Sequence, residues 1–67
     1  MRSDLLDIIV HVLHQTERAA LLATEDTDPA GVWVPLSWFE WSEEPDSVPG
    51  PAEITISKSR AEEKGLA

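Results

Sequence analysis

One segment decides the fold of this chain: Gly31-Val32-Trp33-Val34-Pro35-Leu36-Ser37-Trp38-Phe39-Glu40-Trp41. It holds all three tryptophans and the single phenylalanine of the protein. Successive side chains of a strand face opposite ways, so these rings cannot all point into one small core. Some of this apolar surface must lie outside the core or beneath another element. We expect the segment to be central to the packing and the best candidate for a contact surface, with Trp33 in the core or at its rim beside Phe39.

The chain is short for a protein that folds on its own, at 67 residues. Chains of this size bury only about 60% of their unfolded surface, and no cysteine is present to add a disulfide or a thiolate metal site. Apolar runs such as Ile8-Ile9-Val10 are far shorter than the roughly 20 residues that span a bilayer. Residues 1–14 lack the features of a signal peptide. We expect one domain over residues 1–67, soluble and cytoplasmic, with no membrane partner.

The formal net charge is −8. It argues against direct binding of nucleic acid, which needs lysine and arginine to replace the counterions of the phosphate backbone. It favours solubility and association with basic surfaces. Two interpretations stay open: a solvated, self-repelling surface, or a mimic of a phosphate backbone that targets a basic nucleic-acid-binding protein.

Residues 4–14 fit two periodicities. One set of apolar residues has helical spacing: Leu5, Ile8, Ile9, Val12 and Leu13. Another set alternates along one face of a strand: Leu6, Ile8, Val10 and Val12. The β-branched residues favour the strand, so we predict a strand here and a second one over 15–24. On a strand, His11 and His14 would lie on opposite faces, and without a clear third ligand we expect no metal site.

The rest of the chain reads as turn, strand, loop, strand and helix. Acidic residues, Pro29 and Gly31 predict a turn over 25–31, which joins the strand 15–24 to a strand over 32–41 in a hairpin. Pro35 cannot donate a ladder hydrogen bond and implies an edge, a bulge or a sharp bend. The prolines of 42–51 predict a loop, and Ile54 and Ile56 a short strand over 53–56.

The C-terminal segment carries helix signals. Ser59 and Glu62 match a capping box, and Gly65 followed by Leu66 is typical of a helix C-terminus. The predicted fold is therefore mainly β, a small α+β protein. We expect a curved antiparallel sheet of three to five strands, or a small open barrel, with a short C-terminal helix.

Three stretches, taken in order, resemble a known group of sequences: Gln15-Thr16-Glu17-Arg18-Ala19-Ala20-Leu21-Leu22, Trp33-Val34-Pro35-Leu36-Ser37-Trp38-Phe39-Glu40, and Ala61-Glu62-Glu63-Lys64-Gly65-Leu66. The group comprises small uncharacterised proteins of bacteria and their phages with a T-E-K-A-x-L … W-I-P-K-S-Q-I … A-E-E-K-G-L pattern. The resemblance spans residues 8–66. It implies a small curved antiparallel sheet with a short C-terminal helix, and no catalytic role.

Two departures from that pattern bear on function. Leu36 and Trp38 stand where similar proteins have lysine and glutamine, on a face that those proteins keep polar. This places an apolar patch there, and such patches often mark binding sites. The final helix lacks the Pro-x-Trp that begins it in similar proteins, so Trp38 or Trp41 would fill the gap from the sheet. Leu36 and Trp38 thus form either an interface or a repacked part of the fold.

No arrangement of residues indicates catalysis. The serines have no evident base partner, and Glu43 and Glu44 lie in a proline-rich loop where pKa tuning is not expected. We therefore expect no enzyme and no cofactor. The preferred function is a small acidic protein-binding module, a phage-encoded inhibitor of a host defence complex that binds nucleic acid, in the manner of anti-CRISPR proteins.

An acidic rim would steer this module toward a basic protein surface, and a tryptophan anchor would hold it there. The partner-binding residues that we expect are Leu36, Trp38, Glu40, Trp41, Glu43, Glu44 and Asp46. Two alternatives stay open. One is a structural or accessory homo-oligomer, such as a homodimer in which Leu36 and Trp38 pair across a two-fold axis. The other is a small β-barrel that stacks nucleic-acid bases on exposed tryptophans.

Overall fold

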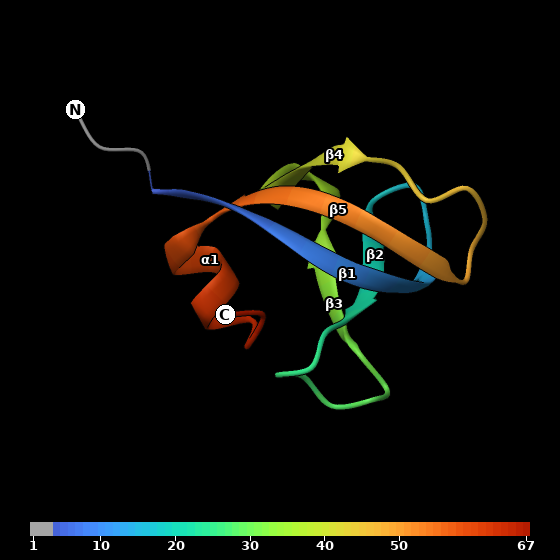
Figure 1. Ribbon diagram of the computed structural model, residues 1–67, viewed down its shortest axis with the longest axis horizontal. Coiled ribbons are helices and arrows are strands. Elements are labelled where there is room, and N and C mark those ends of the chain that lie inside the picture. The colour runs from blue at the N-terminus through green and yellow to red at the C-terminus, as the bar shows by residue number, and fades with distance from the viewer. Residues whose placement is uncertain (1–3) are drawn as a thin grey trace.

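Five antiparallel strands form one open sheet in the computed structural model, which describes residues 4–67 (Figure 1). The strands are β1 (Leu5–Gln15), β2 (Ala19–Ala23), β3 (Val32–Pro35), β4 (Phe39–Glu43) and β5 (Gly50–Ser57). Their order in the sheet is β3-β2-β1-β5-β4. A 3-10 helix, Leu36–Trp38, joins β3 to β4, and the helix α1 (Lys58–Glu63) follows β5 directly. The predicted mainly β fold with a short C-terminal helix is confirmed.

Strand β1 is long enough to pair with two neighbouring strands. It pairs with β5 from Leu5 to Val12, and with β2 only from His11 to Gln15. The predicted strand is confirmed, because alternate residues face the core as expected: Leu6 and Ile8 are half-buried, and Val10 and Val12 are buried. Since β2 joins only the second half of β1, the two strands diverge toward the start of β1 (Figure 1).

A register shift between Val12 and His14 decides where the two histidines lie. His11 pairs with Ala23 and His14 with Leu21. Paired residues share a face, as do residues two apart on one strand, so both histidines lie on the outward face. The prediction that they lie on opposite faces is wrong, because the bulge adds one residue to the strand. Within residues 4–67, no group of three His, Cys, Asp or Glu side chains could hold a metal ion.

The segment 31–41 forms two strands rather than the single predicted one. Pro35 ends β3, and the 3-10 helix then turns the chain so that β3 and β4 lie at opposite edges of the sheet. The Leu36 N–H donates to the Arg18 carbonyl oxygen at 2.8 Å and fastens this turn to the loop between β1 and β2. Both an edge position and a sharp bend are therefore present at Pro35, as a proline in a strand requires.

The predicted hairpin between the second and third strands is confirmed. β2 and β3 pair from Ala19 with Pro35 to Leu22 with Val32. Within the connecting turn, Asp28 accepts from Ala30 N–H at its Oδ1 and from Gly31 N–H at its carbonyl oxygen, both at 2.8 Å. Gly31 has φ +83°, a conformation that side chains with a Cβ adopt only with strain.

The core lies on the inner face of the curved sheet and beneath α1. Its buried apolar residues are Val10, Val12, Ala20, Leu22, Val34, Phe39, Ala52, Ile54, Ile56, Ala61 and Leu66. Every strand contributes to it, and none of the buried residues in the described chain is polar or charged. Leu36, Trp38 and Trp41 are half-buried and pack against this cluster.

Helix α1 begins two residues earlier than the capping box predicts. Its N-cap is Ser57, whose Oγ accepts from the Arg60 N–H at 3.4 Å. The Ser59–Glu62 box is wrong, because β5 runs directly into the helix. The predicted end of the helix at Gly65 is confirmed, because Gly65 has φ +75°. The Gly65 N–H donates to the Glu62 carbonyl oxygen, and the Leu66 N–H donates to the Ala61 carbonyl oxygen at 2.8 Å. These bonds form a Schellman motif, which places Leu66 in the core.

Candidate functional site

Leu36 and Trp38 are half-buried and pack against the core, and Trp38 also contacts cations of the C-terminal segment. The guanidinium carbon of Arg60 lies 4.8 Å from the centroid of the Trp38 ring, and the Lys64 Nζ lies 5.3 Å from it. Two cations of α1 and its C-terminal turn thus contact the aromatic ring of the 3-10 helix. Trp38 supplies from the sheet the aromatic contact that the start of α1 lacks. The arrangement fits repacking within the fold rather than an exposed apolar patch.

The other two tryptophans differ in their surroundings. Trp33 is 47% exposed, and its ring makes an edge-on contact with the ring of His14, with the centroids 5.9 Å apart. Trp41 is half-buried and contacts Phe39 edge-on at 5.0 Å. The prediction that Trp33 lies in the core or at its rim beside Phe39 is therefore wrong, because Trp33 is not among the residues that pack against the core. The alternation of β3 points Val34 inward, which turns Trp33 outward.

The predicted carboxylates are divided between two hollows. Glu43, Glu44 and Asp46 line one hollow of about 190 Å³. Glu40 lies elsewhere on β4, in a hollow of about 470 Å³ that it shares with Trp38 and Arg60. Glu40 and Trp38 thus lie in a different hollow from Glu43, Glu44 and Asp46, the other acidic residues that the sequence suggested as partner contacts.

Four residues that the sequence did not single out complete the smaller hollow, and these are Ile9, Pro51, Ala52 and Glu53. Glu53 pairs with Glu43 across β4 and β5, and with Ile9 across β5 and β1. The row Ile9–Glu53–Glu43 therefore crosses three strands on the outward face. Alternation along β5 places Glu53 on the face of the sheet opposite to the buried Ile54. Only the strand register shows that Glu53 lies between Ile9 and Glu43.

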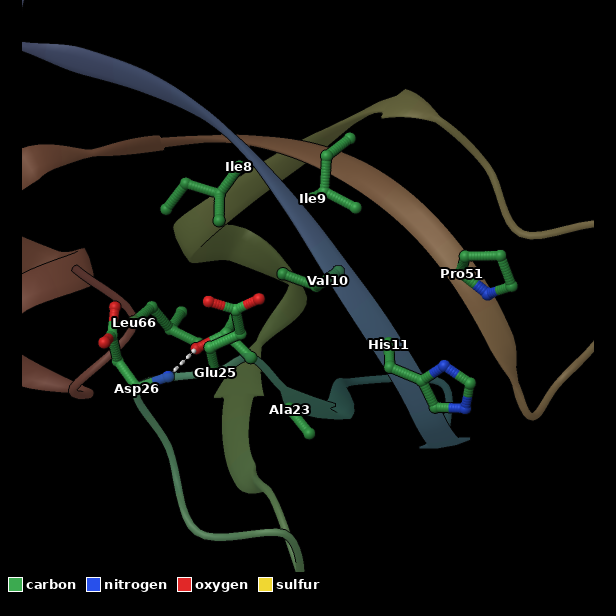
Figure 2. Close-up of a pocket in the computed structure, with 10 residues that line it drawn as sticks. Ile8, Ile9, Val10, His11, Ala23, Glu25, Asp26, Pro51 and Leu66 are labelled. Carbon is green, nitrogen blue, oxygen red and sulfur yellow. Dashed lines mark hydrogen bonds between the residues drawn. The ribbon is translucent and has the colours of Figure 1, made fainter.

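Ile9 is the most exposed of the large apolar residues that the structure describes, at 68%. It lies between the hollow just described and a second one of about 630 Å³, whose lining includes Ile8, Val10, Glu25 and Asp26 (Figure 2). Pro51 also lines both hollows. An exposed β-branched apolar side chain thus stands on the ridge between two acidic depressions.

We call this region the Ile9 surface and define it by its apolar ridge and its carboxylates. The ridge consists of Ile9 and Pro51. The carboxylates are Glu25, Asp26, Glu43, Glu44, Asp46 and Glu53. Among the described residues that line its two hollows there is no lysine or arginine. The surface therefore combines a negative rim with an apolar centre, a combination that marks binding sites for proteins.

A polar row lies next to the Ile9 surface and ties three strands together. The Thr55 hydroxyl donates to Asp7 Oδ1 at 2.6 Å, and the Ser42 and Thr55 hydroxyl oxygens lie 2.5 Å apart. Because the single Thr55 hydroxyl proton goes to Asp7, the Ser42 hydroxyl is the donor in the second bond. The row connects the edge strand β4 through β5 to β1, and so holds the acidic wall of the smaller hollow in register.

Comparison with protein-family models, with curated proteins and with solved structures gives no match. The resemblance to small bacterial and phage proteins therefore stays a prediction from the quoted residues. No helix within residues 4–67 is both long and apolar enough to cross a membrane.

Proposed function

We propose that this protein binds a basic surface of another protein through the Ile9 surface. One observation carries the proposal: Ile9 is 68% exposed between carboxylates, with no lysine or arginine among the described residues that line the two hollows. A negative rim raises the rate of encounter with a positive partner. An apolar side chain at the centre of an interface is where binding energy concentrates once water is excluded.

The partner class follows from this charge. Proteins that bind DNA or RNA carry clusters of lysine and arginine that contact phosphates. Carboxylates on the sheet and in the segments next to it can occupy those cations and exclude the nucleic acid. The net charge of −8 supports such an inhibitor. The resemblance to phage proteins adds the context, an inhibitor of a host defence complex comparable to anti-CRISPR proteins.

The anchor in this proposal differs from the one expected from the sequence. Leu36 and Trp38 pack against the core, whereas Ile9 faces outward. The acidic residues expected to contact the partner are largely retained, because Glu43, Glu44 and Asp46 share one hollow with Glu53. The proposed partner contact therefore lies on β1 and β5, at the end of β4, in the loop after β4 and in the turn after β2.

The test compares two triple variants with equal change in charge. In the first, Glu43→Gln, Glu44→Gln and Asp46→Asn remove three of the six carboxylates of the acidic rim. In the matched control, Glu17→Gln, Glu62→Gln and Glu63→Gln neutralise three exposed carboxylates elsewhere. Both are used, with the wild type, to capture proteins from a bacterial lysate, and the captured protein is then tested for competition with labelled DNA or RNA.

We expect the wild type and the control to capture a basic nucleic-acid-binding protein and to displace its nucleic acid. The rim variant should associate more slowly, with a weaker dependence on salt, because fewer charges steer the encounter. Capture that is equal for all three proteins, or a partner that keeps its nucleic acid when bound, would contradict the proposal.

A further inference from the structure

Strand β1 has one edge without a strand neighbour over Leu6–Val10. This part pairs with β5 on one side, and pairing with β2 on the other side begins only at His11. In an antiparallel sheet, alternate residues direct their N–H and C=O groups to opposite edges. Every second residue of Leu6–Val10 therefore directs its backbone groups away from β5. Among the described residues, no backbone hydrogen bond outside the strand ladders involves these five.

The chain turns away just where β2 would otherwise cover this edge. β2 ends at Ala23, and the Thr24 N–H donates to Thr27 Oγ1 at 2.8 Å instead of continuing the ladder. The Thr27 hydroxyl in turn donates to the Thr24 carbonyl oxygen at 3.2 Å. Both backbone groups of Thr24 are thus used within the turn, so β1 and the chain after β2 separate.

The larger hollow of the Ile9 surface lies along this edge. Figure 2 shows Ile8, Val10 and His11 on β1, with Glu25, Asp26 and Leu66 across from them and Ala23 at the end of β2. The hollow measures about 630 Å³. Its inner wall is apolar, because Val10 and Leu66 are buried core residues and Ile8 is half-buried. The hollow thus offers backbone groups on one side and apolar side chains at its base.

The charge of the hollow selects its occupant. Glu25 and Asp26 are exposed at its mouth, and no lysine or arginine of the described chain lines it. The Asp26 N–H donates to Thr24 Oγ1 at 3.2 Å, which holds this turn against the end of β2. A cationic side chain that emerges here meets two carboxylates, whereas an acidic one meets repulsion. Side chains directed toward Val10 must be apolar, because they contact the core.

We propose, resting on the function proposed above, that the basic partner contributes an extended segment that pairs as an added strand with Leu6–Val10. The segment takes the place alongside β1 that a longer β2 would fill. Its apolar side chains face Ile8, Val10 and Leu66, and its lysine or arginine side chains reach Glu25 and Asp26. Main-chain hydrogen bonds give such a contact its affinity, and alternate side chains give its specificity.

The test uses a synthetic heptapeptide of alternating lysine and valine, acetylated and amidated, added to isotope-labelled protein and followed by NMR. We expect the largest shifts at the amides of Leu6–Val10, and slower hydrogen exchange at those that face the added strand. Two further peptides carry N-methyl groups on either the valine or the lysine nitrogens. One of the two should bind at least about tenfold more weakly, because an added strand turns one set of N–H groups toward β1.

Charge is tested with Glu25→Gln/Asp26→Asn against Glu62→Gln/Glu63→Gln, which removes equal charge from α1. The first variant should weaken binding of the lysine peptide by about fivefold or more, and the second by less than about twofold. Equal binding of both methylated peptides, with shifts confined to Glu43–Asp46, would overturn strand addition and leave the proposed function standing. Equal binding of a glutamate–valine peptide would count against both.

Discussion

Single side chains divide into those that pack in the core or against it and those that face outward. Val10 and Val12 are buried, whereas Ile9, which precedes Val10 and faces the opposite side of the strand, is 68% exposed. Trp38 belongs to the first kind, because its ring is held between the core and the cations Arg60 and Lys64. A mutation at Trp38 and one at Ile9 should therefore have opposite consequences for stability and binding.

Trp38→Ala should lower the free energy of unfolding by about 2–4 kcal/mol, because it removes a packed aromatic ring and the cation–π contacts of Arg60 and Lys64. Urea unfolding followed by circular dichroism measures this loss. Binding of the captured partner by the fraction that remains folded should be unchanged. A normal free energy of unfolding with lost binding would place Trp38 in the interface instead.

The two glycines with positive φ should respond differently to alanine. At Gly65, φ is +75° and an added Cβ meets nothing within 4 Å, so the cost is only that of the left-handed conformation, about 1–2 kcal/mol. At Gly31, φ is +83° and the Cβ would also lie 3.0 Å from the Leu22 carbonyl oxygen and 2.9 Å from Leu13 Cδ1. Gly31→Ala should therefore cost clearly more than Gly65→Ala in urea unfolding. Equal losses would contradict the close approach at Gly31.

At the scale of elements, α1 depends on Ser57 rather than Ser59 for its N-terminal cap. Ser57 Oγ accepts from the Arg60 N–H, whereas Ser59 is an exposed residue within the helix. Ser57→Ala should lower the free energy of unfolding by about 1 kcal/mol, and Ser59→Ala should leave it nearly unchanged. The same urea experiment distinguishes the two serines. A larger loss at Ser59 would restore the capping box that the sequence suggested.

The elements themselves follow from the sequence far better than their junctions do. Alternation in residues 4–14, the acidic turn before Gly31 and the Gly65–Leu66 ending each act over a few neighbouring residues, and all three are present. The placement of β3 and β4 at opposite edges of the sheet and the bulge after Val12 depend on which strand lies alongside. Local patterns do not contain that information, because register is set by long-range packing.

The candidate site was only partly predictable for the same reason. Glu43, Glu44 and Asp46 stand close in sequence, so their grouping needed no tertiary information. Ile9 and Glu53 join them through the pairing of β1, β5 and β4, which no local pattern reveals. Helical spacing would place Ile9 in the core, whereas the alternation of a strand places it on the outward face.

At the scale of the whole molecule, a large net negative charge is confined to a small volume. A net charge of −8 is carried by a molecule with a radius of gyration of 11.0 Å. Like charges at such separations are only partly screened at low salt, where the Debye length is about 30 Å at 0.01 M and about 10 Å at 0.1 M. Self-repulsion therefore destabilises the compact state.

Added sodium chloride should raise the free energy of unfolding between about 0.01 M and 0.1 M, because the screened carboxylates repel one another less. Over the same range the association rate with a basic partner should fall, because screening also weakens steering. Urea unfolding and surface-based binding kinetics measure the two effects. A free energy of unfolding that drops with salt would mean that attractive ion pairs outweigh the repulsion.

The most direct test of the Ile9 surface is the affinity of the captured partner for Ile9→Thr and for Leu5→Thr. Both residues lie on the outward face of β1, at 68% and 60% exposed, and threonine is a β-branched residue that favours a strand at either position. We predict that Ile9→Thr weakens binding by about tenfold or more, while Leu5→Thr leaves it within about twofold. Equal affinity of the two variants, or capture of nothing but further copies of this chain, would contradict the account.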